Sequence, residues 1–174
     1  NRHRFVATHP MAGTEHSGVE AAIPNLFDHK YTVLCEAEKS APDAQKLVED
    51  LYQSIPMQLA HLDRHAHDLH TAYVSHISHI SSFALALTTL EKEENARNIF
   101  DLASGGFSST VRLAKSSRDM CTPIFIDNAD NVITVLDTYV EKMLAFREAI
   151  AKGDKEKVDS LITEANRIKK VLLK

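Results

Sequence analysis

The chain has 174 residues, of which 44% are hydrophobic, so it can bury the core of one domain or slightly more. Its formal net charge of −4 at pH 7, without a basic stripe, argues against a nucleic-acid partner. No apolar run reaches the ~18 residues that a membrane span needs, so no membrane association is expected. Cys35 and Cys121 form no CxxC pair, and we expect two buried thiols in a reducing, cytoplasmic compartment.

The first 62 residues have the pattern of the end of an α/β domain. The segments 5–8, 31–35 and 57–60 predict strands, and Pro42 opens a predicted helix that continues to Ser54. Three strands and one helix are too few for a free-standing doubly wound sheet. Because the chain begins at Asn1 directly before a strand, we expect it to be the later part of a longer protein.

Helical periodicity then continues to the end of the chain. The predicted helices are one long helix at 63–91, a short helix at 93–102, a short helix that Ser108 or Ser109 caps after the Gly105-Gly106 break, a long helix at 120–152 ended by Gly153, and a last helix capped by Asp154. Such long apolar helices in a small region favour a helical dimer, and a monomeric bundle is the alternative.

The stretch His9-Pro-Met-Ala-Gly-Thr-Glu-His-Ser-Gly18 follows the first predicted strand. Pro10 has no N–H with which to extend the strand, so we expect His9 at the strand end, where ligands meet open α/β sheets. A neutral imidazole there can accept a proton near pH 7. The alternative is that His9 only satisfies a local hydrogen bond. Glu15 lies on the loop that follows.

Six histidines lie between His61 and His79. The four-residue spacing of His61 and His65 suits a pair of metal ligands, but no carboxylate or cysteine completes a known spacing, so no metal site is predicted. His76 and His79 are one turn apart on a mostly apolar helix face. Since burying an unpaired histidine is costly, both either face a polar pocket or bond to backbone carbonyls in the core.

Arg112 lies between Val111 and Leu113 after a Gly-Gly turn. An arginine among apolar neighbours is held by an acidic partner or reserved for an anionic ligand, and the sequence leaves both alternatives open. The chain has five glycines, and neither GxGxxG nor a Walker A pattern can be built from them. The sequence therefore contains no recognisable cradle for a dinucleotide pyrophosphate.

Three segments together resemble the prephenate dehydrogenase family of tyrosine biosynthesis. They are the stretch at 9–18, the segment Val74-Ser-His-Ile-Ser-His79 after His67-Asp68, and Arg112-Leu-Ala-Lys-Ser116 after Gly105-Gly106-Phe107. The resemblance covers nearly the whole chain and keeps the order of the motifs. The sequence departs from the family where His16 replaces a common lysine, Ser78 a common proline and Cys121 a usual tryptophan.

The resemblance implies a mainly α fold. A helical substrate-binding and dimerisation domain at 63–174 would follow a remnant, at 1–62, of an α/β dinucleotide-binding domain. It implies an NAD- or NADP-dependent prephenate dehydrogenase, with the coenzyme bound mainly by a part upstream of Asn1. It further implies a homodimer that acts on prephenate by oxidative decarboxylation to 4-hydroxyphenylpyruvate, and this piece alone is expected to be inactive.

The resemblance also implies residue roles. His9 would accept a hydrogen bond or the proton of the substrate's ring hydroxyl, Arg112 would hold a carboxylate, and Glu15 would shape the site from its loop. His76 and His79 would line the pocket and bind polar groups. Two alternatives remain: an arogenate dehydrogenase, and a non-catalytic helical dimerisation module. Whether His9, His79 and Arg112 meet in one cleft separates the second alternative from an enzyme.

Overall fold

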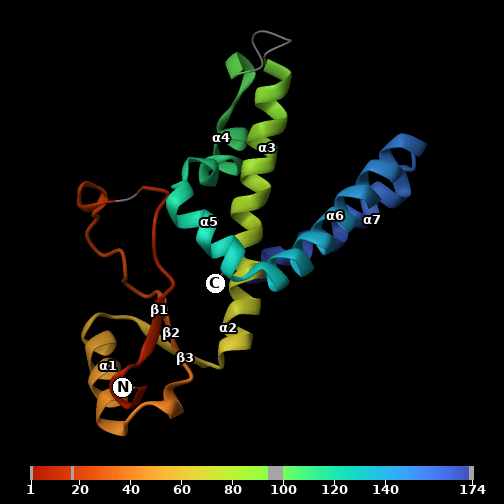
Figure 1. Ribbon diagram of the computed structural model, residues 1–174. Helices are drawn as coiled ribbons and strands as arrows, with labels where there is room; N and C mark the ends of the chain where they lie inside the picture. The colour runs from red at the N-terminus through yellow and green to blue at the C-terminus, as the bar shows by residue number, and fades with distance from the viewer. Residues whose placement is uncertain (1, 17, 94–99, 173–174) are drawn as a thin grey trace. The chain divides into compact units, whose positions relative to one another are not determined.

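The computed structural model describes residues 2–16, 18–93 and 100–172 (Figure 1). Contacts within the chain divide it into two compact units, Asn1–Val132 and Ile133–Lys174, and each is described by itself. The chain is mainly helical, with a short α/β segment at its start, which confirms the predicted fold class. Within the described residues, no helix is long and apolar enough to cross a membrane.

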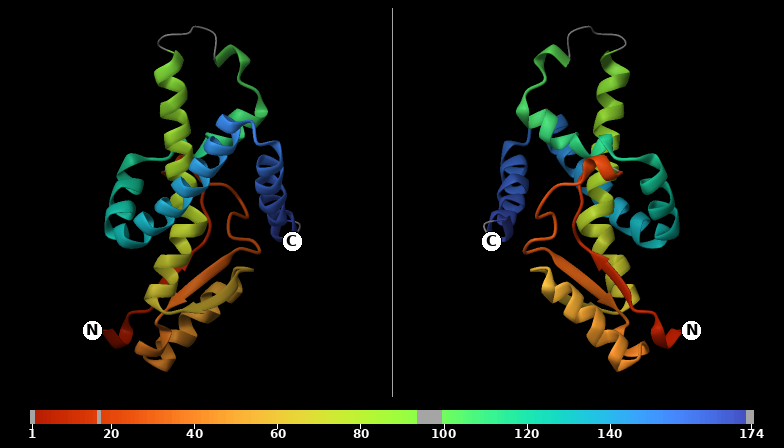
Figure 2. Two further views of the ribbon diagram at one scale, coloured as in Figure 1. Left: turned by 90° about the vertical axis from the view of Figure 1, so that its right-hand side faces the viewer. Right: turned by 90° about the vertical axis from the view of Figure 1, so that its left-hand side faces the viewer.

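The first unit begins with a three-stranded mixed sheet in the order β1-β2-β3. Strand β1 (Ala7–Pro10) runs antiparallel to β2 (Tyr31–Cys35), and β3 (Gln58–Leu62) runs parallel to β2. The central strand β2 carries the buried side chains because it is covered on both edges: Thr32 and Leu34 are fully buried. Helix α1 (Pro42–Ser54), which begins and ends where the sequence predicted, lies beside this sheet (Figure 2).

Strand β1 lies two residues later than the predicted segment 5–8, so that prediction was wrong at both ends. His9 is inside the strand, opposite Val33, and Pro10 is its last residue, opposite Thr32. A proline is tolerated there because β1 is an edge strand of the described sheet. Strand β3 likewise extends to Leu62 rather than ending at residue 60.

The long helix predicted at 63–91 is present but interrupted. Asp63 caps α2 (Arg64–Thr71) by accepting from the backbone N–H of Ala66, and α3 spans Ile77–Glu93. Between them lies η4, a π turn at Ala72–His76. A π turn inserts one extra residue into a helix and is frequent at functional sites, and hydropathy alone does not reveal it. The predicted short helix at 93–102 lies mainly outside the described residues, which include the 3₁₀ turn η5 (Phe100–Leu102).

The segment after the Gly-Gly pair differs from its prediction. Helix α4 (Gly105–Thr110) begins at the glycines after Ser104, so Ser108 and Ser109 lie inside it instead of capping a helix. Glycines are tolerated in a first turn, where backbone N–H groups have no helical partner in any case. Arg112 then lies in a separate 3₁₀ turn, η6 (Arg112–Lys115).

The helix predicted at 120–152 is two helices. Helix α5 (Arg118–Asp127) is capped by the Ser117 hydroxyl and carries Pro123 inside it, and α6 (Ala129–Lys152) follows directly. The break is at Asn128, whose φ of −109° and ψ of 29° leave the helical region. The first unit also contains the short 3₁₀ turns η1 (Arg2–Arg4), η2 (Val19–Ala21) and η3 (Ala37–Lys39).

The second unit contains most of α6, followed by α7 (Lys155–Ala165), η7 (Asn166–Ile168) and α8 (Lys169–Leu172). Gly153 ends α6 with a φ of +65°, and Asp154 caps α7 by accepting from the backbone N–H of Lys157. Both predictions are confirmed. The chain reverses direction between α6 and α7 (Figure 2).

Candidate functional site

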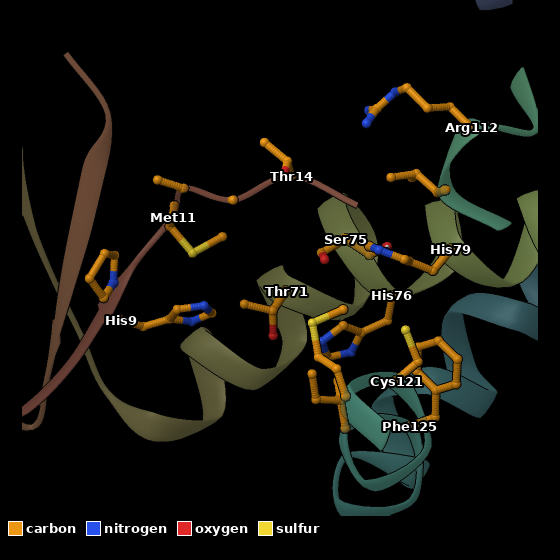
Figure 3. Close-up of a pocket in the computed structure, with 16 residues that line it drawn as sticks. His9, Met11, Thr14, Thr71, Ser75, His76, His79, Arg112, Cys121 and Phe125 are labelled. Atoms are coloured by element: carbon orange, nitrogen blue, oxygen red, sulfur yellow. The ribbon is translucent and has the colours of Figure 1, made fainter. Parts of the chain in front are cut away.

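The first unit contains a cavity of about 340 Å³, within the range of small-molecule sites. Strand β1 and the loop after it supply His9, Met11 and Thr14, and the π turn with its flanking helices supplies Thr71, Ser75, His76 and His79 (Figure 3). Turn η6 adds Arg112, and α5 adds Cys121 and Phe125. The structure therefore brings His9, His79 and Arg112 together in one cleft, although they are far apart in the sequence.

His9 is held by a second histidine from α2. The Nδ1 atom of His9 lies 2.8 Å from Nε2 of His67, and the two rings meet edge to face at 5.1 Å between centroids. Burial, and secondarily the neighbouring His67, lower the pKa of His9 below the ordinary histidine value of 6.5. Its imidazole is therefore neutral at pH 7, as a proton acceptor must be.

His76 and His79 present different nitrogens to their surroundings. Nδ1 of His79 lies 3.0 Å from the Ser75 carbonyl oxygen, so this nitrogen carries the hydrogen and donates it. Nδ1 of His76 lies 3.3 Å from the Asn128 amide nitrogen, which donates to it. Burial first, and then neighbouring histidines led by His79, lower the pKa of His76. His79 thus combines both predicted alternatives: it bonds to a backbone carbonyl and it lines the cavity.

Arg112 forms an ion pair with Glu15 at 2.5 Å between Nη1 and Oε2. The Glu15 side chain is 14% exposed and that of Arg112 is 50% exposed, so the pair lies at the cavity mouth rather than in the core. A hydrogen bond from its own backbone N–H, followed by the contact with Arg112, holds the pKa of Glu15 below its usual value. The sequence left open whether Arg112 pairs with an acidic side chain, and the structure shows that it pairs with Glu15. Arg112 also lines the cavity, so a ligand role is compatible with this pairing.

Sequence reasoning did not find the wall that α5 provides. Met120, Cys121, Ile124 and Phe125 all line the cavity, and the Phe125 ring lies 6.2 Å from that of His76. Met120 and Ile124 are four residues apart, and so are Cys121 and Phe125, which places both pairs on one side of a helix. This signal was available in the sequence. His67 was noted in a motif but received no role. No group of three or more His, Cys, Asp or Glu side chains suited to a metal ion occurs within the described ranges.

Comparison with known families identifies the chain. Residues 1–60 match the model of the prephenate dehydrogenase nucleotide-binding domain, and residues 63–164 match that of the prephenate dehydrogenase dimerization domain. A nucleotide-binding segment followed by a helical dimerization domain is the plan of a two-domain dehydrogenase. The chain belongs to the prephenate dehydrogenase family.

Individual relatives agree with this assignment. The chain is 28% identical over 156 residues to prephenate dehydrogenase of Bacillus subtilis, covering 90% of this chain and 42% of the relative. It is 26% identical over 153 residues to cyclohexadienyl dehydrogenase of Zymomonas mobilis, covering 87% of this chain and 52% of the relative. The chain spans about half the length of the curated relatives it matches.

A solved structure of prephenate dehydrogenase from A. aeolicus, in complex with hydroxyphenyl propionate and NAD⁺, superposes with a TM-score of 0.87 at 30% identity. The match covers 99% of this chain and 60% of that one. The structure of Synechocystis arogenate dehydrogenase, at 21% identity and a TM-score of 0.76 over 97% of this chain and 61% of that one, shares the fold.

Proposed function

We propose that the cavity binds prephenate and that the chain is the C-terminal part of an NAD- or NADP-dependent prephenate dehydrogenase. In this proposal, residues 1–62 complete the dinucleotide-binding domain, and residues 63–174 form the substrate-binding and dimerisation domain of a homodimer. The observation that carries the proposal is that a neutral histidine, His9, and a guanidinium, Arg112, line the same cavity. Prephenate offers a ring hydroxyl to the first and a carboxylate to the second.

His9 acts on the ring hydroxyl. As the ring carbon that bears this hydroxyl loses hydride, positive charge develops on the hydroxyl group. The electron pair that carbon dioxide leaves behind closes the aromatic ring, so the hydroxyl shares its proton with an acceptor during the step and keeps it in the product phenol. A neutral imidazole in hydrogen-bond contact with the hydroxyl stabilises the developing positive charge. The ring becomes aromatic, which provides the driving force, so the residues of this chain need to polarise and orient the substrate.

Arg112 holds a carboxylate at the cavity mouth. Guanidinium offers five N–H donors in a planar fork, and in this structure Glu15 is bonded to Nη1. A substrate carboxylate can therefore use the other donors, or displace Glu15. In either case the ion pair with Glu15 orients the guanidinium before substrate arrives, and this is the way in which Glu15 shapes the site.

The coenzyme is proposed from the family, whose A. aeolicus member was solved with NAD⁺. When bound, NAD or NADP supplies the hydride acceptor. The described residues do not fit its pyrophosphate. Gly13 and Gly18 lie on the loop after β1, and Gly18 precedes only the three-residue turn η2, which is too short to offer a helix N-terminus. We therefore assign coenzyme binding mainly to residues that precede this chain in the complete enzyme and derive no coenzyme contact here.

Arogenate is the second candidate substrate, since it carries an ammonium where prephenate has a ketone. The observation in its favour is the tautomer of His79. Because Nδ1–H of His79 donates to the Ser75 carbonyl, Nε2 of the neutral ring is an acceptor that suits an ammonium. Convergence of His9, His79 and Arg112 on one cleft speaks against the remaining alternative, a non-catalytic dimerisation module.

The test is an assay of the complete enzyme with prephenate and with arogenate, each with NAD and with NADP, following the absorbance of the reduced coenzyme. Turnover of prephenate that exceeds turnover of arogenate supports the proposal, and the reverse preference supports the second candidate. A well-folded complete enzyme that turns over neither substrate contradicts both.

A further inference from the structure

We propose that His67 and Asp68 form a hydrogen-bonded relay that fixes the tautomer of His9, so that the catalytic imidazole presents an unprotonated Nε2 to its substrate. Both are positioning residues, since they act through His9 and do not line the cavity. The chemical purpose of the relay rests on the function proposed above, but its geometry does not depend on that function.

The relay begins at Asp68. Its Oδ1 atom lies 2.8 Å from Nδ1 of His67. An ionised carboxylate only accepts hydrogen bonds, so Nδ1 of His67 must carry the hydrogen. The Asp68 side chain is 50% exposed and that of His67 is 20% exposed, so water solvates the carboxylate while the imidazole faces inward.

The second step passes from His67 to His9. A neutral imidazole carries one hydrogen, and in His67 it is on Nδ1, so Nε2 is an acceptor. This Nε2 lies 2.8 Å from Nδ1 of His9, which must therefore donate. Nε2 of His9 is left with a free lone pair, and it belongs to a ring that lines the cavity (Figure 3).

The consequence is chemical. In water a neutral histidine prefers to carry its hydrogen on Nε2, and a His9 in that form would offer a donor where the ring hydroxyl needs an acceptor. Triads in other enzymes solve the same problem with a carboxylate that bonds directly to the catalytic histidine. Here a second imidazole stands between them, because Asp68 is on α2 and His9 is on β1.

The backbone that carries the relay is itself held in place. The Thr71 hydroxyl donates to the carbonyl oxygens of His67 and Asp68, at 3.0 and 3.1 Å. The Asn128 amide, from the break between α5 and α6, donates to the same Asp68 carbonyl at 2.7 Å. A hydroxyl of the same helix and an amide from the α5–α6 break thus fix the helical turn on which His67 and Asp68 lie, as a positioning device requires.

The charge state of His67 decides the direction of the relay. The titratable groups that act on His9 and His76 in this region are His67, His79 and Asp68. If His67 were doubly protonated, its Nε2–H would donate to Nδ1 of His9 and force the hydrogen of His9 onto Nε2. The relay therefore requires a neutral His67, and this opposite arrangement is the result that would overturn it.

Nitrogen-15 NMR of the histidine side chains tests the relay on this chain directly, because the two ring nitrogens have different shifts in each tautomer. The His9 signals are assigned by their loss in His9→Asn. Near neutral pH we expect His9 as the Nδ1–H tautomer, and we expect His67→Phe, which keeps a ring but removes the acceptor, to convert it to Nε2–H. His9 found as Nε2–H in the unaltered chain overturns the proposal, whether or not the variant folds.

Two further variants sharpen the result. In His67→Gln, the side-chain oxygen can accept at the position of Nε2, so His9 should keep its Nδ1–H tautomer. His70→Phe removes an exposed histidine of the same helix and should change nothing. A His9 tautomer that is unchanged in a folded His67→Phe variant would show that His67 does not control it.

Kinetics on the complete enzyme separate this proposal from the proposed function. His67→Phe should lower kcat by about tenfold or more with little change in KM, and His67→Gln should restore most of the loss. An active enzyme whose kcat is unchanged in His67→Phe overturns the relay alone. A complete enzyme without turnover overturns the proposed function, and the NMR result then stands by itself.

Discussion

Three imidazole rings face the same cavity with different nitrogens protonated. His76 accepts at Nδ1 from Asn128, so its Nε2 carries the hydrogen, whereas His79 donates from Nδ1 and keeps a free Nε2. In the proposed relay, His9 likewise donates from Nδ1, to His67, and keeps a free Nε2. The cavity therefore offers one hydrogen-bond donor, Nε2–H of His76, and two acceptors, Nε2 of His9 and Nε2 of His79. The hydrogen-bond partner of each ring's Nδ1 decides whether its Nε2 donates or accepts.

His9→Asn in the complete enzyme is expected to lower kcat by about 10²–10⁴-fold, the range for an acid–base group, while KM changes little. Because burial lowers the pKa of His9 below 6.5, the neutral base is present above that pKa and is lost as the pH falls through it. The acid limb of kcat/KM, which reports the groups of the free enzyme, should thus lie below pH 6.5 in the unaltered enzyme and be absent from the variant. The exposed His3→Asn is the control, and a near-normal kcat in His9→Asn would remove His9 from the mechanism.

Arg112→Ala is expected to raise KM for prephenate about tenfold or more, with a smaller effect on kcat. Tenfold corresponds to about 1.4 kcal/mol, the low end for a lost charge-assisted hydrogen bond. Arg112→Lys should recover only part, because an ammonium cannot form two parallel bonds to one carboxylate. The melting temperature should change little, since the Arg112 side chain is 50% exposed and its ion pair is screened by solvent.

The matched control for Arg112 is Arg118→Ala, whose side chain is 92% exposed on α5. If Arg112→Ala leaves KM unchanged and unfolds the protein, the pair with Glu15 is structural. The carboxylate site must then be sought elsewhere, beginning with His76 and His79.

At the scale of elements, the sequence predicted those whose local signals are strong. Pro42 and the apolar spacing predicted the limits of α1, and the run of β-forming residues predicted β2. Gly153 and Asp154 predicted the turn between α6 and α7. The π turn at 72–76 was not predicted, because it adds one residue to the helix without changing the hydropathy pattern. The break at Asn128 was not predicted, because the hydrogen bond that stabilises it joins Asn128 to Asp68, which is far away in the sequence.

The candidate site follows the same division. The sequence could single out five candidate residues because each belongs to a motif of unusual composition, namely His9, Glu15, His76, His79 and Arg112. His67 and the α5 wall were missed because their part in the site depends on contacts between segments far apart in the sequence. Of the predicted residues, Glu15 touches Arg112 and the other four line the cavity.

Asn128→Ala tests whether the side chain at the α5–α6 break stabilises the packing of α2. The Asn128 amide donates to the Asp68 carbonyl at 2.7 Å, and its oxygen accepts from Asn131 at 2.7 Å, so the side chain joins the α5–α6 break to α2. Removing it leaves a partly buried carbonyl without this donor, and we expect a loss of about 1–3 kcal/mol in the free energy of unfolding. Urea denaturation measures it, with the exposed Asn166→Ala as control, and equal stability of the two variants would contradict the assignment.

At the scale of the whole molecule, the chain contains the cavity proposed to bind substrate, but its sequence has no recognisable pyrophosphate cradle. None of its five glycines builds a GxGxxG or Walker A turn. We therefore expect these 174 residues alone to bind NAD and NADP weakly or not at all. Isothermal titration calorimetry with each coenzyme tests this, using the complete enzyme as the positive control. Micromolar binding by this chain would show that its own residues suffice.

The second unit exposes many large apolar side chains. On α6 they include Ile133, Val140, Met143, Leu144 and Ile150, each at least 46% exposed. Ile162, Ile168, Val171 and Leu172 continue the series on α7, η7 and α8, each at least 49% exposed. On α6 these positions recur at spacings of seven and four residues, so they share one side of the helix. An exposed apolar face of this kind marks an interface. The family model that matches residues 63–164 is that of a dimerization domain, which supports a second copy of the chain as the partner.

The chain is accordingly expected to be a dimer in solution. Light scattering coupled to size-exclusion chromatography should give about twice the 19.4 kDa of one chain at micromolar concentration. Replacing Met143 and Leu144 together by glutamate places charge on the exposed apolar face of α6, and because burying unpaired carboxylates is costly, this variant should elute as a monomer. Lys30→Glu, which changes the charge of an exposed residue of the first unit directly before β2, should leave the dimer intact. A mass near 19.4 kDa for the unaltered chain would mean that these apolar side chains do not join two copies.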